Sequence, residues 1–458
     1  MPPREIIVVG AGISGLTAAH GLRKRGHSFR ILEATERAGG VIGTRRRDGA
    51  LYEQGPNSTL DTSPLIGDLL RDLDIEGERV EASAVASTRF VVRDGAPVAL
   101  PTSPGAFMAT RAFTTKAKLR LMREPFIARA RPDVEESIAS FVRRRLGVEF
   151  LDYAIDPFVA GIYAGDPERI SVPAAFPRLH ALEQKYGSLI RGQILGARDR
   201  RKAGEKAKNA AASFSFRNGM QTLTDALAGA LPPIEHGVRA IRITRADDGS
   251  YFVEADKSGQ RISYRSRAVV VAAPAGAASA MIGDLAADAA RALAAIDYAP
   301  IVVVASAFRR SDVAHPLAGF GMLVPKLEQR GILGSLFSSS MFKGRAPDGT
   351  VLLTTFAGGR RNPEVAAMSD SGVAGLVRAE LADLVGARGE PLWQEIVRWP
   401  RAIPQYDLGH LARLREVEIA ESKWPGLYFC ASYRGGVAVG DCIKNGNGIA
   451  ERVDAWLR

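Results

Sequence analysis

The chain has 458 residues, of which 46% are hydrophobic and 24% are charged, and its formal net charge is +11. These proportions are ordinary for a chain that buries a large core, so they exclude disorder or a collagen-like repeat as its main state, and the length allows about three structural units. The positive charge favours anionic partners such as phosphates, carboxylated substrates or acidic lipids, without choosing among them.

The cysteine and histidine content argues against disulfides and metals. Cys430 and Cys442 are the only cysteines, so we expect two buried thiols in a reducing compartment. The six histidines show no ligand spacing, and no metal is expected. No stretch reaches the ~18 apolar residues of a membrane-spanning helix, and the first residues do not read as a signal peptide. We expect a cytoplasmic protein, and nucleic acid is not an expected partner because no reading motif accompanies the charge.

The first 33 residues carry a dinucleotide-binding pattern. A β-branched run at 6–9 precedes a glycine turn, a helix predicted over 16–25 and a second strand over 28–32 that ends at Glu33. The acidic residue follows the second glycine by about 20 positions, as a βαβ fingerprint requires. The turn is expected to seat a pyrophosphate at the helix N-terminus, and Glu33 to accept from the ribose hydroxyls. The expected contacts of the turn are Gly10, Ala11, Gly12, Ile13, Ser14 and Gly15.

The segment after Glu33 indicates which dinucleotide is bound. It reads Glu-x-x-Glu-Arg-x-Gly-Gly over 33–40, and it resembles the FAD-binding amine oxidase and phytoene desaturase superfamily. That resemblance implies FAD, with a cradle extended along the cofactor. It also implies that the loop at 55–58, forced by Gly-Pro, passes beside the flavin ring, although Asn57 and Ser58 could each belong to an ordinary surface turn. The residues implied are Ala34, Arg37, Gly40, Val41, Gly55, Pro56, Asn57 and Ser58.

The C-terminal segment returns to the same site. A strand pattern at 427–431 is broken by Gly435 and Gly436, and an amphipathic helix is predicted over 441–457. A helix N-terminus aimed at a flavin would stabilise the reduced form; Asp441 could instead be only the N-cap. Short strands predicted between 234 and 273 add a middle contribution, so the FAD domain is expected to be discontinuous. The expected contacts are Val238, Ala431, Val437, Ala438, Val439 and Asp441.

Motifs spread over the whole chain narrow the resemblance to one family within that superfamily. The segment 431–443, the segment Gly-Ile-Tyr-Ala-Gly-Asp-Pro at 161–167 and the segment Gly-Phe-Gly-Met-Leu-Val-Pro at 319–325 resemble the protoporphyrinogen oxidase family, oxygen-dependent flavoenzymes of haem synthesis. Shorter matches at 337–339, 345–349 and 402–406 complete the set.

The family resemblance implies an α/β fold with three domains. A Rossmann-like FAD-binding domain would comprise 1–86, 217–280 and 421–458. An α+β substrate domain would comprise 87–95, 204–216 and 281–420, and a helical membrane-associating domain 96–203.

The resemblance also implies a substrate site. Arg89, which opens an Arg-Phe-Val-Val strand pattern, would hold one propionate, because a guanidinium grips a carboxylate bidentately; taken alone it could be a surface charge. The carbonyl of Gly161 would face the macrocycle. Phe320, Leu323 and Phe356 would sandwich its rings, although both phenylalanines taken alone would be assigned to the core. No catalytic residue is assigned, since developing aromaticity drives the oxidation without a strong base.

The implied reaction is six-electron oxidation of protoporphyrinogen IX to protoporphyrin IX by noncovalent FAD, with O2 reduced to three H2O2. Three alternatives stay open: coproporphyrinogen III oxidation on the same fold, an amine oxidase with a lysine near the flavin or a cysteinyl flavin, and a flavin-bound assembly factor without activity. Ferrochelatase is a candidate partner for product transfer, and a homodimer is left open.

A basic segment of the chain indicates whether the protein associates with a membrane. Between 104 and 132, arginines and lysines alternate with apolar residues, of which Leu119, Met122 and Phe126 recur at helical spacing. Such a helix can lie on anionic lipid, or it can face the core with a solvated basic side. Because family members are commonly membrane-associated through this region, we expect peripheral association with the cytoplasmic membrane. The basic stretch 196–212 is expected to be an exposed insert or a docking patch.

Overall fold

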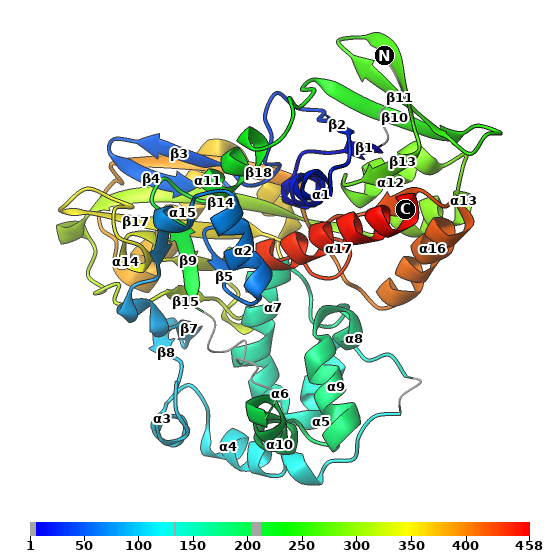
Figure 1. The fold of residues 1–458 in the computed structure, drawn as a ribbon. Helices are drawn as coiled ribbons and strands as arrows, with labels where there is room; N and C mark the ends of the chain where they lie inside the picture. The colour runs from blue at the N-terminus through cyan, green and yellow to red at the C-terminus, as the bar shows by residue number, and fades with distance from the viewer. Residues whose placement is uncertain (1–5, 132–133, 203–211) are drawn as a thin grey trace.

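The computed structural model describes residues 6–131, 134–202 and 212–458. Its sheets form one end of the molecule and a group of helices, α3 to α10, forms the other (Figure 1). Those helices and the turns between them are α3 (Pro104–Ala109), α4 (Thr115–Met122), η3 (Glu124–Phe126), α5 (Ile138–Arg145), α6 (Val148–Phe150), η4 (Leu151–Ile155), α7 (Asp156–Tyr163), α8 (Val172–Ala175), α9 (Pro177–Tyr186) and α10 (Leu189–Lys202).

A four-stranded parallel sheet joins the start, the middle and the end of the chain. Its order is β19-β13-β1-β2. The central strands are buried on both faces, which is why they read as unbroken apolar runs. The strands are β1 (Ile6–Val9), β2 (Phe29–Leu32), β13 (Ala268–Val271) and β19 (Leu427–Phe429).

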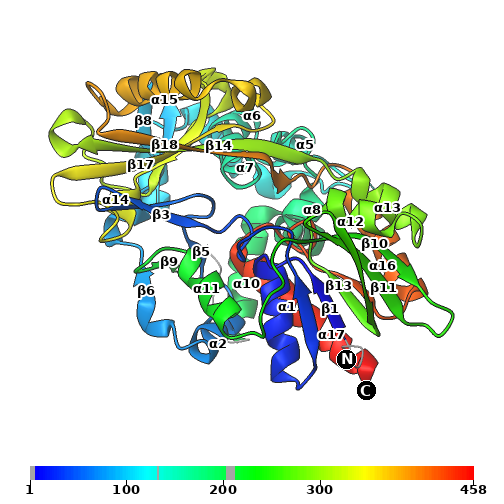
Figure 2. The same ribbon diagram turned by 90° about the horizontal axis from the view of Figure 1, so that it is seen from above.

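The first and last helices cover one face of this sheet, where α17 (Val439–Leu457) lies alongside α1 (Ile13–Lys24) in Figures 1 and 2. Their approach depends on glycine, since a Cβ added at Gly446 would stand 2.7 Å from the carbonyl oxygen of Ser14. The two helix N-termini therefore belong to one packed unit.

Helices and a small antiparallel sheet cover the other face. Tyr251, which belongs to this small sheet, is fully buried against the 424–426 turn, and its hydroxyl lies 2.9 and 3.0 Å from the carbonyl oxygens of Trp424 and Pro425, which share its proton. The elements are α12 (Ala275–Ile282), α13 (Ala287–Ala294), α16 (His410–Lys423), β10 (Val238–Arg245), β11 (Tyr251–Lys257) and β12 (Gln260–Ser266).

A seven-stranded sheet forms the second large layer. Its order is β18-β14-β17-β16-β15-β7-β8, antiparallel except for β15 beside β7. Helix α15 (Asp370–Val385) covers one face, and α7 packs on the other (Figure 2). The strands are β7 (Phe90–Arg93), β8 (Ala96–Ala99), β14 (Tyr298–Arg309), β15 (Gly321–Leu323), β16 (Ile332–Leu336), β17 (Thr350–Gly358) and β18 (Trp393–Pro404).

Smaller elements connect these layers. A hairpin and a three-stranded sheet of order β5-β9-β6 lie between the large units. They and the remaining helices are β3 (Thr44–Arg47), β4 (Ala50–Glu53), β5 (Thr59–Leu60), α2 (Pro64–Asp72), η1 (Glu76–Glu78), β6 (Arg79–Glu81), η2 (Ala84–Ser87), β9 (Ser213–Phe216), α11 (Gln221–Gly229), η6 (Arg310–Asp312), η7 (Lys326–Glu328), α14 (Ser338–Met341) and η8 (Pro363–Ala367).

A buried ionic cluster holds the helical end together. Arg145 is fully buried and contacts two buried carboxylates, with 3.2 Å to Glu124 Oε1 and 2.7 Å from its Nε to Glu183 Oε1. Glu124 also accepts from the backbone N–H of Leu189 at 2.9 Å, the first residue of α10. These hydrogen bonds offset the cost of removing the charges from water, so four helical elements are joined at one point.

The mixed α/β architecture predicted from the sequence is confirmed, and several element boundaries are corrected. The first helix begins at Ile13, three residues earlier than predicted, because the glycine turn itself starts the helix. The closing helix begins at Val439 rather than Asp441, and its N-cap is Ala438. The alternative that Asp441 is the N-cap is therefore wrong, since it lies inside the first turn.

The basic segment 104–132 is not one helix. Thr114 caps a new helix, its hydroxyl accepting from the N–H of Ala117 at 3.2 Å, and Pro125 ends it, so the segment breaks into α3, α4 and η3. Leu119, Met122 and Phe126 are 58%, 64% and 84% exposed, so the interpretation of this stripe as a core-facing side is wrong. Residues 196–202 end α10 rather than forming a loop, and most of the rest of the predicted insert, 203–211, lies outside the described residues.

Candidate functional site

The glycine turn after β1 combines two closely packed glycines with one that faces open space. Gly10 has φ +102°, and a Cβ there would stand 2.8 Å from the carbonyl oxygen of Ala272; a Cβ at Gly15 would overlap the carbonyl of Gly10. A Cβ at Gly12 would meet nothing within 4 Å, and Gly12 is the N-cap of α1 without a side-chain cap. The fold itself therefore needs Gly10 and Gly15, whereas Gly12 leaves a cradle at a positive helix end, which fits a pyrophosphate.

Glu33, directly after β2, borders this cradle and is 9% exposed. Its carboxylate accepts from the backbone N–H of Ala11 at 2.8 Å and from the N–H and hydroxyl of Thr35 at 2.9 and 2.7 Å. The backbone N–H of Val238 donates to the Glu33 carbonyl at 2.8 Å. The structure thus brings Ala11, Glu33 and Val238 together, and it adds a bond from Glu33 to the turn that the spacing did not predict.

The Arg37 loop closes over the same turn. The Arg37 guanidinium donates to the carbonyl oxygens of Ala38, Gly40 and Ile42 at 2.8, 2.7 and 2.7 Å. The N–H of Gly39 donates to the Ala11 carbonyl at 2.8 Å. The Arg37 side chain therefore holds the backbone of its own loop, which is the predicted extension of the cradle.

The predicted flavin-side loop lies against this extension. A Cβ at Gly55 would overlap the carbonyl of Val41, and the Asn57 side-chain amide donates to the Gly55 carbonyl at 3.1 Å. The indole N–H of Trp399 donates to the Gln54 carbonyl at 2.7 Å, which ties the loop to β18. Pro56 and Ser58 are half-buried in the same loop.

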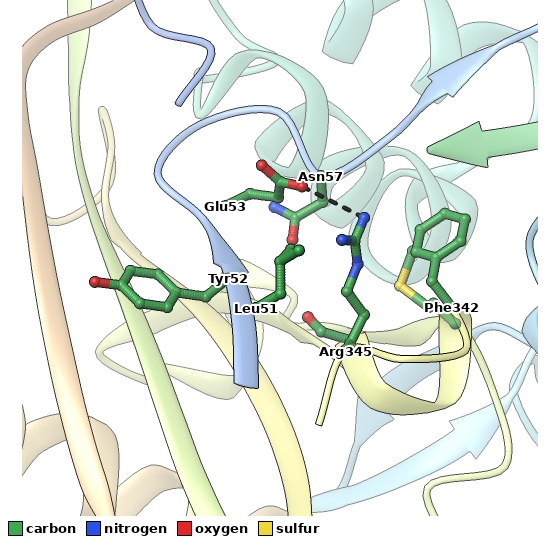
Figure 3. A pocket seen from close by; sticks show the side chains of 8 residues that line it. Leu51, Tyr52, Glu53, Asn57, Phe342 and Arg345 are labelled. Atoms are coloured by element: carbon green, nitrogen blue, oxygen red, sulfur yellow. Dashed lines mark ion pairs between the residues drawn. The ribbon is translucent and has the colours of Figure 1, made fainter. Parts of the chain in front are cut away.

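Beneath that loop, Asn57 lines a cavity of about 10 Å³ together with an ion pair (Figure 3). Arg345 lies 3.4 Å from Glu53 and also donates to the Ser215 hydroxyl at 2.5 Å, and both charged side chains are under 5% exposed. Burial raises the pKa of Glu53 despite the nearby guanidinium. The cavity has room for about one water molecule, so this pair anchors the loop rather than holding a ring. Sequence reasoning gave Glu53 and Arg345 no role, although Arg345 is the first residue of the 345–349 match.

A tyrosine hydroxyl ties down the loop between β19 and α17. Tyr406 donates to the Ser432 carbonyl at 2.7 Å and accepts from the N–H of Gly436 at 2.9 Å. Ala431 is buried two residues after the end of β19, and Val437 and Ala438 lead into α17, which no side chain caps. Sequence reasoning quoted the 402–406 motif without assigning Tyr406 this contact.

The ring of His410 packs against the ring of Tyr406. Its ring stacks on Tyr406 with centroids 4.1 Å apart, and its Nε2 lies 2.9 Å from the Tyr433 carbonyl. His410 is fully buried, and burial lowers its pKa from 6.5 to about 4. The histidine is therefore neutral in the folded protein at neutral pH.

This shift predicts acid sensitivity. The unfolded chain binds a proton at His410 below pH 6.5 and the folded chain only below about 4, so stability is lost as the pH falls through that window. Between about pH 7 and pH 5, His410 should lower the free energy of unfolding by about 2 kcal/mol. Denaturant unfolding of wild type and His410→Gln at both pH values measures this: the loss should shrink by that amount in the variant, and an equal loss in both would contradict the assignment.

Arg89 lies beside Phe320. Arg89 is exposed, one residue before β7 rather than inside it, with its guanidinium carbon 5.4 Å from the Phe320 ring centroid. The N–H of Phe320 donates to the Thr88 carbonyl at 2.8 Å. Within the ranges that the structure describes, no carboxylate forms an ion pair with Arg89. A cation in this setting is available to an anionic ligand.

Gly161, Leu323 and Phe356 form a second group. A Cβ added at Gly161 on α7 would stand 2.9 Å from Leu323 Cδ2. Leu323 on β15 and Phe356 on β17 both pair with Gly334 of β16, so a position without a side chain lies between them. Gly161 is exposed, and the other two are half-buried. The five predicted substrate residues therefore gather at the two ends of β15, a strand of only three residues.

Both cysteines are buried, as expected, at 1% and 4% exposed. Burial raises the pKa of Cys430 to about 12 and that of Cys442 to about 11, so both stay protonated at neutral pH. In the described part of the chain, no cluster of three or more histidine, cysteine or acidic residues could hold a metal ion. Within the same ranges, no helix is both long enough and apolar enough to cross a membrane.

Comparison with known proteins identifies the family. The family described as flavin-containing amine oxidoreductase matches residues 13–454. Protoporphyrinogen oxidase 2 of Arabidopsis thaliana is 33% identical over 99% of this chain and 94% of its own, and coproporphyrinogen III oxidase of Bacillus subtilis (strain 168) is 28% identical over 99% and 98%.

The fold comparison agrees. The crystal structure of a protein from Exiguobacterium sp. 255-15, provisionally named a protoporphyrinogen oxidase, aligns with a TM-score of 0.83 and 24% identity over 99% of each chain. The chain therefore belongs to the flavin-containing amine oxidoreductase family, as an FAD-dependent oxidoreductase related to the protoporphyrinogen oxidases.

Proposed function

We propose that this enzyme oxidises protoporphyrinogen IX to protoporphyrin IX. Over the whole reaction the macrocycle loses six hydrogen atoms, and three molecules of O2 gain them as three H2O2. Two relatives that cover nearly the whole chain are named protoporphyrinogen oxidases, from Arabidopsis thaliana and Nicotiana tabacum. The product is a porphyrin, so a metal-inserting enzyme such as ferrochelatase is the class of partner expected to receive it.

The observation that carries the proposal is Arg89. It is an exposed guanidinium without an ion-pair partner among the described residues, and it lies against the Phe320 ring. A porphyrinogen combines a large apolar ring with carboxylate arms, so it matches a cation placed beside apolar side chains. The three residues of β15 that separate this cation from the Gly161 group span about 10 Å, a length that a tetrapyrrole with one propionate arm can cover.

The chain's own contribution is binding and orientation. Gly12 and the α1 N-terminus would hold the pyrophosphate, Glu33 the ribose, and the Val437–Val439 backbone the flavin ring edge. Bound FAD supplies the hydride acceptor. Leu323 and Phe356 would exclude water from the ring, and the missing side chain of Gly161 lets Leu323 pack against α7.

Coproporphyrinogen III is the second candidate substrate, because a relative that matches 99% of this chain is a coproporphyrinogen III oxidase. That substrate carries four propionates, whereas the site proposed here offers one guanidinium. Porphyrin fluorescence followed with each porphyrinogen in parallel separates the two. The proposal expects the higher kcat/KM with protoporphyrinogen IX, and a higher value with coproporphyrinogen III would assign the second function instead.

We propose that FAD is held without a covalent bond. Both cysteines are buried and protonated, so neither is poised to attack the flavin. Acid precipitation of the purified enzyme should therefore release all of its flavin into the supernatant. Flavin that stays on the precipitated polypeptide would refute this.

We also propose that the exposed apolar side chains Leu119, Met122 and Phe126 contact lipid. They lie near the basic residues Lys116 and Arg123, as an interfacial segment requires. Flotation with anionic vesicles should recover the wild type and lose a triple serine variant, and equal flotation of both would contradict the assignment. A triple serine change at Leu327, Leu392 and Leu411, which are exposed apolar positions elsewhere, is the control.

A further inference from the structure

One loop holds helix α7 at both ends. The loop is Gly358–Arg361, which starts at the last residue of β17, and we call it the α7 clamp. The backbone N–H of Arg360 donates to the carbonyl of Ala164, the C-cap of α7, at 2.8 Å. The next side chain reaches back to the start of the helix, where the Arg361 guanidinium lies 2.7 Å from the Asp156 carboxylate and donates to the Asp156 carbonyl at 2.9 Å.

The clamp is itself anchored in the seven-stranded sheet. Gly358 and Gly359 have φ of +90° and +71°, a conformation that favours glycine, and the N–H of Gly359 donates to the Pro300 carbonyl of β14 at 2.7 Å. The same Arg361 guanidinium also donates to the Val324 carbonyl at 2.8 Å. Val324 follows Leu323, so one side chain connects the start of α7 to the strand that α7 faces.

Asp156 connects independently to η7, the turn that follows that strand. Its second carboxylate oxygen accepts from the backbone N–H of Lys326 at 2.8 Å. The Asp156 and Arg361 side chains are each only 7% exposed, and burial raises the pKa of Asp156. Because the desolvation of a buried pair can exceed its attraction, the contribution of this pair to fold stability is expected to be small, and its main effect is on the position of α7.

The helix enters the clamp through an irregular turn. Residues Leu151–Ile155 are π-helical, and α7 continues directly from them. A π segment changes which side of the following helix faces a neighbour, and such segments occur frequently at functional sites. Together, the π turn and the clamp fix the rotation of α7 in which Gly161 meets Leu323.

We propose that Asp156 and Arg361 are positioning residues that set how closely α7 approaches β15, and thereby hold Gly161 against Leu323 as one wall of the macrocycle site. This inference rests on the proposed function. Neither residue is expected to touch FAD, so loss of the pair should displace this wall of the macrocycle site and leave the cofactor in place. Arg361 acts by holding two backbone carbonyls and one carboxylate at once, a pattern that a lysine can reproduce only in part.

The test compares Arg361→Met, Arg361→Lys and a control, Arg330→Met. Arg330 forms an ion pair with Glu380 of α15 at 2.9 Å, on the opposite face of the sheet. Arg361→Met should raise KM for protoporphyrinogen IX by roughly tenfold or more with a smaller change in kcat, and Arg361→Lys should recover part of it. The flavin content and visible spectrum should stay as in the wild type, and the control should change neither constant.

A binding readout separates this inference from the proposed function. Quenching of protoporphyrin IX fluorescence measures product binding without turnover. If the wild type binds no porphyrin and oxidises no porphyrinogen, the proposed function fails. If the wild type binds and Arg361→Met binds equally well, or if the control loses as much affinity as Arg361→Met, the positioning role is wrong.

A stranded buried carboxylate could prevent folding of Arg361→Met. The double variant Asp156→Asn/Arg361→Met removes that charge and should show the same rise in KM. Wild-type KM in the double variant would overturn the inference, whatever the single variant does.

Discussion

Gly12→Ala is expected to lose FAD while the protein without cofactor keeps its stability. A Cβ at this position meets no atom of the chain within 4 Å, so the fold tolerates it, but it occupies the space into which a pyrophosphate must come. We expect FAD affinity to fall by roughly 100-fold, which is about 3 kcal/mol. Titration of the cofactor-free protein with FAD measures the affinity, and thermal unfolding of the same sample measures the stability.

Gly15→Ala is the matched control for this prediction. Its Cβ would overlap the carbonyl of Gly10 and would stand 3.0 Å from the Cβ of Ala272. This variant should therefore lose stability even without FAD, because α1 must move away from the sheet. If Gly12→Ala binds FAD as tightly as the wild type, the glycine turn does not hold the pyrophosphate.

Arg89→Ala is expected to have the second large effect, on substrate rather than cofactor. Removing a charge-assisted contact to a propionate should raise KM by the equivalent of about 1.5–3 kcal/mol, or roughly 10- to 150-fold. Arg89→Lys should fall between the wild type and alanine, since an ammonium cannot pair bidentately. Initial rates of porphyrin formation over a range of substrate concentrations measure both constants.

The control for Arg89 is Arg309→Ala. Arg309 is also an exposed arginine; it is the last residue of β14, where it pairs with Asp312 at 3.7 Å. Its loss should leave KM unchanged. Release of FAD from Arg89→Ala would show that Arg89 is structural, and an unchanged KM would remove it from the substrate site.

The parts of the fold that could be predicted are those that depend on the spacing of residues close together in the chain. The strand, glycine turn and helix after residue 6 follow from β-branched residues and from glycines at fixed distances, and the parallel strands follow from apolar runs buried on both faces. The prediction of one helix over 104–132 was wrong because the helical spacing of Leu119, Met122 and Phe126 gives no information about the cap at Thr114 or the break at Pro125.

The contacts that were missed join residues far apart in the chain. Arg361 and Asp156 are separated by 205 positions, and the tie from Trp399 to Gln54 spans 345. No periodicity links such positions, so neither contact could be read from the sequence. Likewise, the bond from Glu33 to Ala11 depends on how tightly the turn closes, which spacing alone does not specify.

Anaerobic addition of protoporphyrinogen IX to the purified yellow enzyme tests directly whether bound FAD accepts electrons from this substrate. The visible flavin absorbance should bleach as porphyrin fluorescence appears, and admission of air should restore the absorbance and release peroxide. Arg89→Ala should bleach only at higher substrate concentration. A colourless protein that takes up no FAD, or a flavin spectrum that protoporphyrinogen leaves unchanged, would contradict the proposal that bound FAD oxidises this substrate.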